Sequence, residues 1–183
     1  MQRLIAAAAV AGALGACASA PPRAAPRDTP QLRLAPALLG HPLALQQHLT
    51  LQAPGHDQQL DVLLEADVRH VQLGLVAMGQ VAARLDWDNT TLTEDRAPWW
   101  PAAVSGARIL SDLQLTLWPV AAIQAALPPG WTLVESGDVR TLSQDGEAVT
   151  VITHPAPSVV ELDQRRAHFK LKIESRPSGD AAS

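Results

Sequence analysis

The stretch from Ile109 to Leu127 constrains the fold of this chain most, because it is the only long segment whose apolar residues repeat with a helical period. Apolar residues three and four positions apart lie on one face of a helix, and that face must be buried. The residues of this face are Ile109, Leu113, Leu117, Val120, Ile123 and Leu127. Pro119 cannot donate a backbone hydrogen bond, so an insert of about residues 106–127 should form two short helices, with Pro119 near the first turn of the second. The alternation in Leu113–Leu117 would also fit a strand, but the helical period covers more residues.

Apolar and polar residues alternate on both sides of this insert, which is the pattern of half-buried β-strands. Turn residues such as Pro54-Gly55 and Asp145-Gly146 separate the alternating runs. The expected strands are Leu43–Ala53, Gln58–Ala66, Val68–Ala77, Val81–Trp87, a short Thr90–Thr93, Trp131–Glu135, Val139–Leu142, Ala148–Thr153, Val159–Leu162 and Ala167–Ile173. We therefore predict a mostly β domain of the α+β class, a strongly curved antiparallel meander whose apolar face is covered by the helices.

The composition limits the function. With 183 residues, 47% hydrophobic and 17% charged, the chain suits one compact domain. The net charge is −4 and the basic residues are scattered, so the basic patch of a nucleic-acid-binding protein is missing. The apolar residues are mainly aliphatic, with no Tyr, one Phe and five Trp, so any pocket should be apolar and offers few platforms for stacking bases.

The N-terminal residues fit a secretory signal peptide, because a positive start is followed by an apolar run, Leu4–Ala13, that is too short to span a bilayer. Cys17 is the only cysteine of the chain, so no disulfide within the chain is expected. The Ala- and Pro-rich segment after it should act as an extended tether. We expect the signal peptide over residues 1–16, the lipidated Cys and tether over 17–37, the folded domain over 38–175 and a flexible tail over 176–183.

The run Leu14-Gly15-Ala16-Cys17 resembles the lipobox of bacterial lipoproteins. The resemblance implies that Cys17 becomes the mature N-terminus and carries lipid, palmitate included. In such lipoproteins an Asp after the Cys typically retains the protein in the inner membrane. Ala18 therefore implies the outer membrane, with the domain facing the periplasm. The alternative is an ordinary signal peptide in which Cys17 is incidental.

A second resemblance concerns the core from Gln114 to Pro119, with Arg140-Thr141-Leu142 after it. These residues resemble the proteobacterial lipoproteins grouped as domain of unknown function 3261, over about Leu38 to Glu174. The motif residues are Gln114, Leu115, Leu117, Trp118 and Pro119. Members of that group are often encoded beside aryl polyene biosynthesis genes and look related to LolA and LolB, the carrier and the outer-membrane receptor for lipoproteins. The resemblance implies a half-open β-barrel, capped by helices over an apolar cavity that holds acyl chains, an aryl polyene lipid or a lipoprotein among them.

One departure from LolB concerns entry into the membrane. LolB uses an exposed apolar residue on an early turn for this purpose, whereas the matching turn here would be Glu65-Ala66-Asp67. The resemblance therefore does not carry direct insertion of lipoproteins over to this chain.

No set of catalytic or metal-binding residues stands out. The histidines lack the spacing of a helical metal site, and the pattern Gly-x-Ser-x-Gly is absent. The histidines are His41, His48, His56, His70, His154 and His168. The carboxylates of Asp86-Trp87-Asp88 and Glu94-Asp95 are better explained as a solvated strand end and loop than as an acid–base pair. We therefore predict a protein that is not an enzyme, with no catalytic residue, no metal and no cofactor.

Two features are open. Trp99-Trp100 either lines a cavity mouth or membrane interface, or is buried as a core plug. Gln114 either makes an internal hydrogen bond or faces solvent. The residues expected to line a cavity are Leu49, Leu73, Leu75, Val81, Leu85, Trp99, Trp100, Leu113 and Leu117.

The leading hypothesis is an outer-membrane lipoprotein that binds or transfers an acyl chain or lipid. Its expected partners are the membrane, through the anchor, and the apolar ligand, with no nucleic acid. The alternative is a non-catalytic structural or assembly subunit that uses the same apolar face to dock an envelope protein. An enzyme acting on acyl chains would need a buried polar cluster, and the sequence does not single one out.

Overall fold

The computed structural model describes residues 29–101 and 104–179. The predicted signal peptide, Cys17 and the tether up to residue 28 lie outside the described residues, as do residues 180–183 of the predicted tail. Ten strands form one antiparallel sheet in the order β5-β4-β3-β2-β1-β10-β9-β8-β7-β6. Strands that follow one another in sequence pair, except β5 and β6, and the pairing of β1 with β10 joins the two halves.

The secondary structure follows the predicted order. Its elements are η1 (Pro36–Leu39), β1 (Leu43–Ala53), β2 (His56–Ala66), β3 (Val71–Ala77), β4 (Gln80–Trp87), β5 (Leu92–Arg96), α1 (Gly106–Leu117), α2 (Val120–Ala126), β6 (Trp131–Ser136), β7 (Val139–Gln144), β8 (Glu147–Ala156), β9 (Val159–Gln164) and β10 (Phe169–Pro177). The mostly β antiparallel meander with two short helices is therefore confirmed. The fifth strand begins at Leu92 rather than at Thr90, and β10 extends to Pro177, into the predicted tail.

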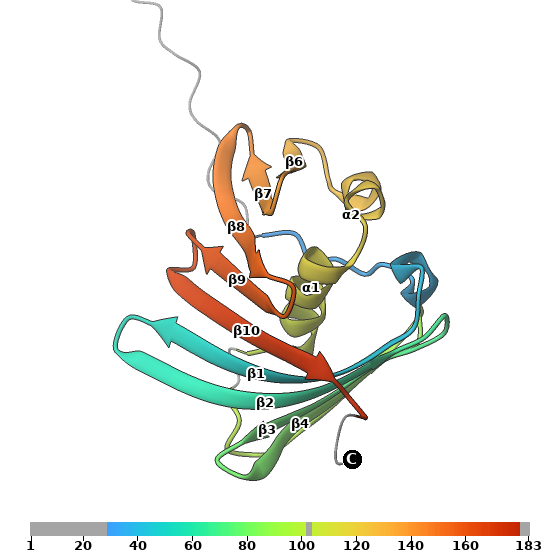
Figure 1. Cartoon of the computed structure of the whole chain (residues 1–183), viewed down its shortest axis with the longest axis vertical. Helices are drawn as coiled ribbons and strands as arrows, with labels where there is room; N and C mark the ends of the chain where they lie inside the picture. Colours follow the sequence, from blue (N-terminus) through green and yellow to red (C-terminus); the bar gives the residue numbers. More distant parts are fainter. Residues whose placement is uncertain (1–28, 102–103, 180–183) are drawn as a thin grey trace, which may run out of the picture.

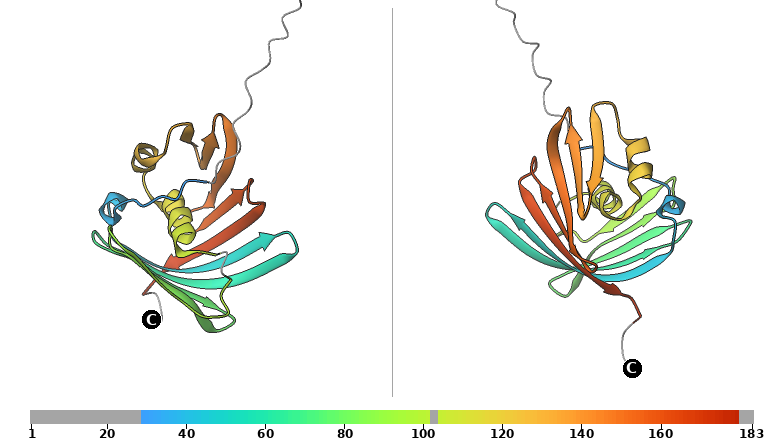
Figure 2. Two further views of the ribbon diagram at one scale, coloured as in Figure 1. Left: turned by 180° about the vertical axis from the view of Figure 1, so that it is seen from behind. Right: turned by 45° about the horizontal axis from the view of Figure 1, so that its top comes forward.

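The sheet is open, because its edge strands β5 and β6 do not pair with each other. It is not strongly curled, so the strong curvature expected from the sequence is wrong. In the view of Figure 1, β1–β4 lie below α1, whereas β6 and β7 lie above it and β9 lies beside it. Figure 2 shows the same arrangement from behind and from above. We call the sheet face that packs on α1 the inner face and the opposite one the outer face.

Helix α1 begins at Gly106. Ser105 caps it, because its Oγ accepts a hydrogen bond from the backbone N–H of Arg108 at 3.3 Å. Gly106 lies so close to the sheet that an added Cβ would be 2.5 Å from Leu85 Cδ2. The helix ends before Pro119, as predicted, and Pro119 is the N-cap of α2, next to the first turn of that helix.

The segment before η1 packs along α1 on the side that carries Ser111 and Gln114. Leu32 and Leu34 are only 3% and 5% exposed. The Leu32 N–H donates to Ser111 Oγ at 3.0 Å, and the Leu34 N–H donates to Gln114 Oε1 at 3.0 Å. The folded part of the chain therefore begins before the predicted boundary at Leu38, because these leucines are buried on the helix.

The motif from Gln114 to Pro119 builds this arrangement. Gln114 Nε2 donates to the Leu34 carbonyl at 3.0 Å, and Trp118 Nε1 donates to the Ala35 carbonyl at 3.2 Å. Gln114 is therefore an internal hydrogen-bond partner, which settles the alternative left open by the sequence. At the C-terminus of α1, Arg140 Nη1 donates to three carbonyls that no helical N–H satisfies. They belong to Leu115 (3.3 Å), Thr116 (3.2 Å) and Trp118 (2.9 Å).

Candidate functional site

A cavity of about 350 Å³ lies between α1 and the inner face of the sheet. This volume is at the lower end of the range for small-molecule pockets, about 300–1,000 Å³. The strands contribute every second residue, which is the expected spacing for one face. The apolar lining consists of Leu49, Leu51, Ala53, Leu60, Val62, Leu73, Leu75, Trp100, Val104, Ile109, Leu113, Leu162, Ala167, Phe169, Leu171 and Ile173. Four polar residues complete it: Gln47, Arg108, Asp112 and Thr116.

The structure brings five of the predicted lining residues to this cavity. They are Leu49, Leu73, Leu75, Trp100 and Leu113. The other four lie elsewhere: Leu85 is in the core beside Gly106, Leu117 is half-buried outside the cavity, and Val81 and Trp99 are 42% and 41% exposed.

Val81 faces outward because β4 contains a register shift. Opposite β3, Leu75 pairs with Ala83, but the next residue, Val76, pairs with Val81. The shift leaves Ala82 and Ala83 both buried, so the inward alternation that ends at Ala83 does not continue to Val81. A bulge of this kind leaves no clear signal in a sequence.

Trp99 and Trp100 have different environments. Trp100 is 6% exposed, lines the cavity and donates from Nε1 to the Val104 carbonyl at 3.2 Å. Trp99 is exposed and lies edge-on to Trp100, with ring centroids 6.3 Å apart. Trp100 is therefore buried and also lines the cavity, whereas Trp99 lies outside the lining.

The cavity reaches the surface at the end of the sheet where β1 ends and β10 begins. Ala53 is the last residue of β1 and Phe169 the first of β10, and both are half-buried. Ala167, in the turn before β10, lines the cavity and is exposed. We call this end the mouth.

Arg108 and Asp112 form the charged part of the lining. Arg108 Nε donates to Asp112 Oδ2 at 2.8 Å, and Arg108 Nη2 lies 2.8 Å from Asp112 Oδ1. Their side chains are only 26% and 15% exposed. Burial raises the pKa of the Asp112 carboxyl above its ordinary value, while the guanidinium of Arg108 acts in the opposite direction. The spacing of four residues on a helix is the one signal by which the sequence could have revealed this pair.

Gln164 holds the same guanidinium from the sheet side. It is fully buried at the end of β9. With its amide turned so that the nitrogen donates to the Val149 carbonyl, its oxygen accepts from Arg108 Nη2. The guanidinium is therefore fixed from two sides.

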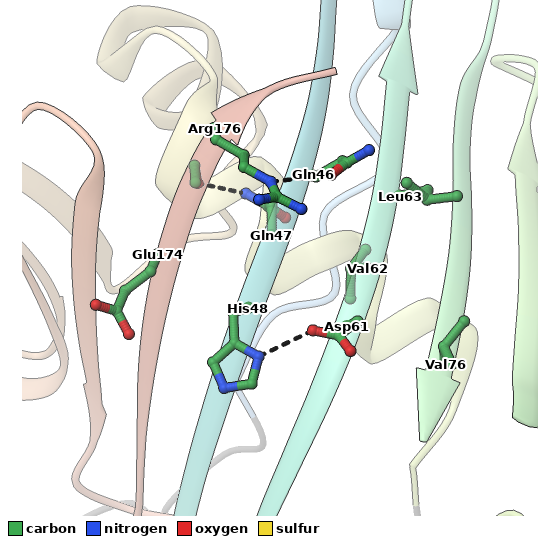
Figure 3. Close-up of a pocket in the computed structure, with 10 residues that line it drawn as sticks. Gln46, Gln47, His48, Asp61, Val62, Leu63, Val76, Glu174 and Arg176 are labelled. Carbon is green, nitrogen blue, oxygen red and sulfur yellow. Dashed lines mark hydrogen bonds and ion pairs between the residues drawn. The ribbon is translucent and has the colours of Figure 1, made fainter. Parts of the chain in front are cut away.

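The outer face carries a groove of a different kind across β10, β1, β2 and β3, drawn in Figure 3. Its polar side chains pair with one another. His48 Nδ1 lies 2.9 Å from Asp61 Oδ1, and Arg176 Nε donates to Gln46 Oε1 at 2.9 Å. This groove offers no continuous apolar wall for a hydrocarbon chain.

A histidine and a carboxylate meet on the outer side of β3 and β4. His70 Nδ1 lies 2.9 Å from Asp86 Oδ1, and Gln72 Nε2 donates to Asp86 Oδ2 at 2.9 Å. The hydrogen bond to Asp86 raises the pKa of His70, and the hydrogen bonds from His70 and Gln72 lower the pKa of Asp86. Within residues 29–101 and 104–179, no three His, Cys, Asp or Glu side chains are grouped to hold a metal ion.

Of the other carboxylates considered from the sequence, Asp88 and Glu94 have local structural partners. Asp88 Oδ1 accepts from the backbone N–H groups of Thr90 and Thr91 at 2.8 and 2.7 Å. Glu94 Oε1 accepts from the N–H of Gly106 at 3.0 Å. In the part of the chain that the structure describes, neither helix has the length and apolar character needed to cross a membrane.

A family model described as "Protein of unknown function (DUF3261)" matches residues 44–177, from β1 to the end of β10. No curated protein matches the chain.

Proposed function

We propose that this chain, which belongs to the DUF3261 family of proteins of unknown function, is an outer-membrane lipoprotein that faces the periplasm and binds or transfers an acyl chain or lipid. The observation that carries the proposal is the apolar cavity on the inner face of the sheet. The proposed role is non-catalytic, and the open sheet with α1 on its inner face would hold the ligand in the manner of LolA and LolB.

Burial of hydrocarbon supplies the energy for binding. A cavity of about 350 Å³ has room for about a dozen groups of the size of a water molecule, which takes up about 30 Å³ in the liquid. Each CH₂ removed from water contributes about 0.8 kcal/mol, so ten of them would contribute about 8 kcal/mol before the cost of association. The cavity therefore suits one chain, or the inner part of one chain.

The anchor is the second part of the proposal. Lipid on Cys17 would hold the domain at the membrane through residues 18–28, which precede the first described residue, Thr29. A chain of this length spans at most roughly 40 Å when fully extended. The cavity would then stay within reach of the bilayer that supplies or receives the ligand.

The test is native mass spectrometry of the full chain with Cys17→Ser, purified from a bacterial periplasm, together with analysis of its organic extract for lipid. We expect a bound chain. A protein that is empty and ignores added fatty acid would contradict acyl-chain binding and would favour the assembly role, to be followed by pull-down of a stable partner.

A pair of variants connects the ligand to the cavity. Leu49→Trp fills the inner cavity, because Leu49 lines it from β1. Leu63→Trp places the same side chain on the outer face, where Leu63 is 52% exposed. The first variant should lose the bound chain and the second should retain it. Equal occupancy in both would place the ligand outside this cavity.

A further inference from the structure

The polar residues of the cavity differ in whether their hydrogen-bonding groups have partners. Thr116 Oγ1 donates to the Leu113 carbonyl at 2.8 Å, and Gln47 Nε2 donates to Ser175 Oγ at 3.0 Å. Arg108 has five N–H donors. Its Nε and Nη2 face Asp112 and Gln164, whereas its Nη1 has no acceptor among the described residues. Two N–H donors of a residue that lines an apolar cavity therefore have no acceptor in the part of the chain that the structure describes.

Arg108 also occupies a particular place in the cavity. It lies in the first turn of α1 and contacts Gln164, the last residue of β9. The turn after Gln164 contains Ala167, which marks the mouth. Leu113 lies more than a turn further along the helix. The charged group is therefore near the mouth, and the apolar wall extends inward from it.

Burying the Arg108–Asp112 ion pair in an apolar cavity wall has a high desolvation cost. Removing an arginine and a carboxylate from water costs several kcal/mol per ion, and a well-packed apolar pair of similar volume is often as stable or more stable. The pair is also incompletely satisfied, since Asp112 Oδ1 is closed off from solvent and accepts no hydrogen bond of good geometry from the described residues. Packing by itself gives no reason for this choice of residues, whereas recognition of a polar ligand group does.

We propose that Arg108 binds the oxygen of the ligand's head group, so that the cavity takes a single acyl chain ending in a carboxylate or an ester carbonyl. The head group lies at the mouth and the chain extends along α1 towards Leu113. This inference rests on the proposed function and specifies its ligand class. A guanidinium forms strong, directed hydrogen bonds with carboxylate oxygens. Asp112 is a positioning residue that fixes the guanidinium and balances its charge while the cavity is empty.

The experiment measures binding of three compounds with the same sixteen-carbon chain, namely palmitate, methyl palmitate and hexadecylammonium. The full chain with Cys17→Ser is used, and each compound displaces a neutral fluorescent probe, N-phenyl-1-naphthylamine. We expect palmitate to bind most tightly, the ester next, and the ammonium at least about tenfold more weakly than palmitate, because only the first two offer an acceptor to Arg108. An ester that binds as well as palmitate would identify the carbonyl rather than the negative charge as the recognised group, in support of the same site.

Variants assign the effect to Arg108. Arg108→Met combined with Asp112→Leu removes the pair without leaving a buried charge, and should reduce palmitate affinity at least about tenfold while the preference over hexadecylammonium disappears. Asp112→Asn retains the guanidinium and should bind palmitate at least as tightly as the parent. Arg84→Met is the matched control, because the Arg84 side chain is 65% exposed and lies outside the cavity. It should leave the affinity unchanged. Thermal unfolding verifies that each variant is folded.

The outcomes separate this inference from the proposed function. If all three compounds bind equally well, or if the double variant binds palmitate as Arg84→Met does, the role of Arg108 is refuted while acyl-chain binding stands. If none of the three compounds binds to the parent protein, both the inference and the proposed function fail.

Discussion

Gln114 is predicted to be a major stability determinant, because its side chain connects α1 to the segment that precedes η1. Its Oε1 accepts from the Leu34 N–H and its Nε2 donates to the Leu34 carbonyl, both at 3.0 Å, and it is fully buried. Gln114→Met keeps the length of the side chain and removes both hydrogen bonds. The Leu34 carbonyl retains a second donor, Trp87 Nε1 at 2.8 Å, whereas the Leu34 N–H has no replacement among the described residues.

The expected loss follows from this asymmetry. A buried donor left without a partner costs about 1–3 kcal/mol, and the second lost hydrogen bond adds about 1 kcal/mol. Gln114→Met should therefore lower the free energy of unfolding by about 2–4 kcal/mol, a large share of the roughly 5–15 kcal/mol that stabilises a typical domain. For a domain of this size, Tm should fall by roughly 5–15 °C.

The assay is urea unfolding followed by tryptophan fluorescence. Trp87 and Trp118 both donate to the segment that Gln114 holds, so they report on its release. The control is Gln59→Met, at an exposed position of β2, which should change the free energy of unfolding by less than about 0.5 kcal/mol. If the two variants differ by less than that amount, the hydrogen bonds from Gln114 do not stabilise the fold as argued.

Three further predictions concern other parts of the chain. Cys17→Ser should move the protein from the membrane fraction to the soluble periplasmic fraction, and a variant that stays with the membrane would contradict lipid anchoring at Cys17. NMR titration should give His70 a pKa above 6.5 that falls towards this value in Asp86→Asn. The pKa of Asp86 is lowered from 3.8 and that of His70 is raised from 6.5, so the pair should stabilise the fold most between these two pH values. The stabilisation should be lost as the pH falls through the folded-state pKa of Asp86 or rises through that of His70. A stability difference between the parent and Asp86→Asn that does not depend on pH would refute this prediction. Gly106→Ala should lower the free energy of unfolding in urea by about 1–3 kcal/mol, because its Cβ would lie 2.5 Å from a neighbouring side chain. Gly74→Ala, where the nearest atom is 4.0 Å away, should lower it clearly less. Equal decreases in the two variants would refute the steric argument.

Most of the elements could be predicted because their signals are local. Alternation identified the strands, and the missing N–H of Pro119 placed the break between α1 and α2. The same alternation brought Leu49, Leu73 and Leu75 to the cavity wall. It failed at Val81, where a register shift turns the side chain to the outer face.

The cavity-lining residues of β10 were not among the predicted lining residues, although β10 has a clear alternation of apolar and polar residues. Phe169, Leu171 and Ile173 alternate cleanly, but only the pairing of β1 with β10 brings them next to Leu49 and Leu51. Strand order is set by contacts between residues far apart in the chain, and a single sequence does not record them.

The sequence by itself determined the mostly β architecture, the two-part helical insert and the spacing of the apolar residues, because propensity, periodicity and proline geometry act over a few residues. Only the tertiary structure decided that the segment containing Leu32 and Leu34 covers α1, that Gln114 is buried rather than exposed, and that Arg108 and Asp112 lie in the wall of an apolar cavity. These features depend on which surfaces meet when the sheet packs on the helix. A polar residue on a helix has the same local pattern whether it faces water or a cavity, and only its long-range neighbours distinguish the two.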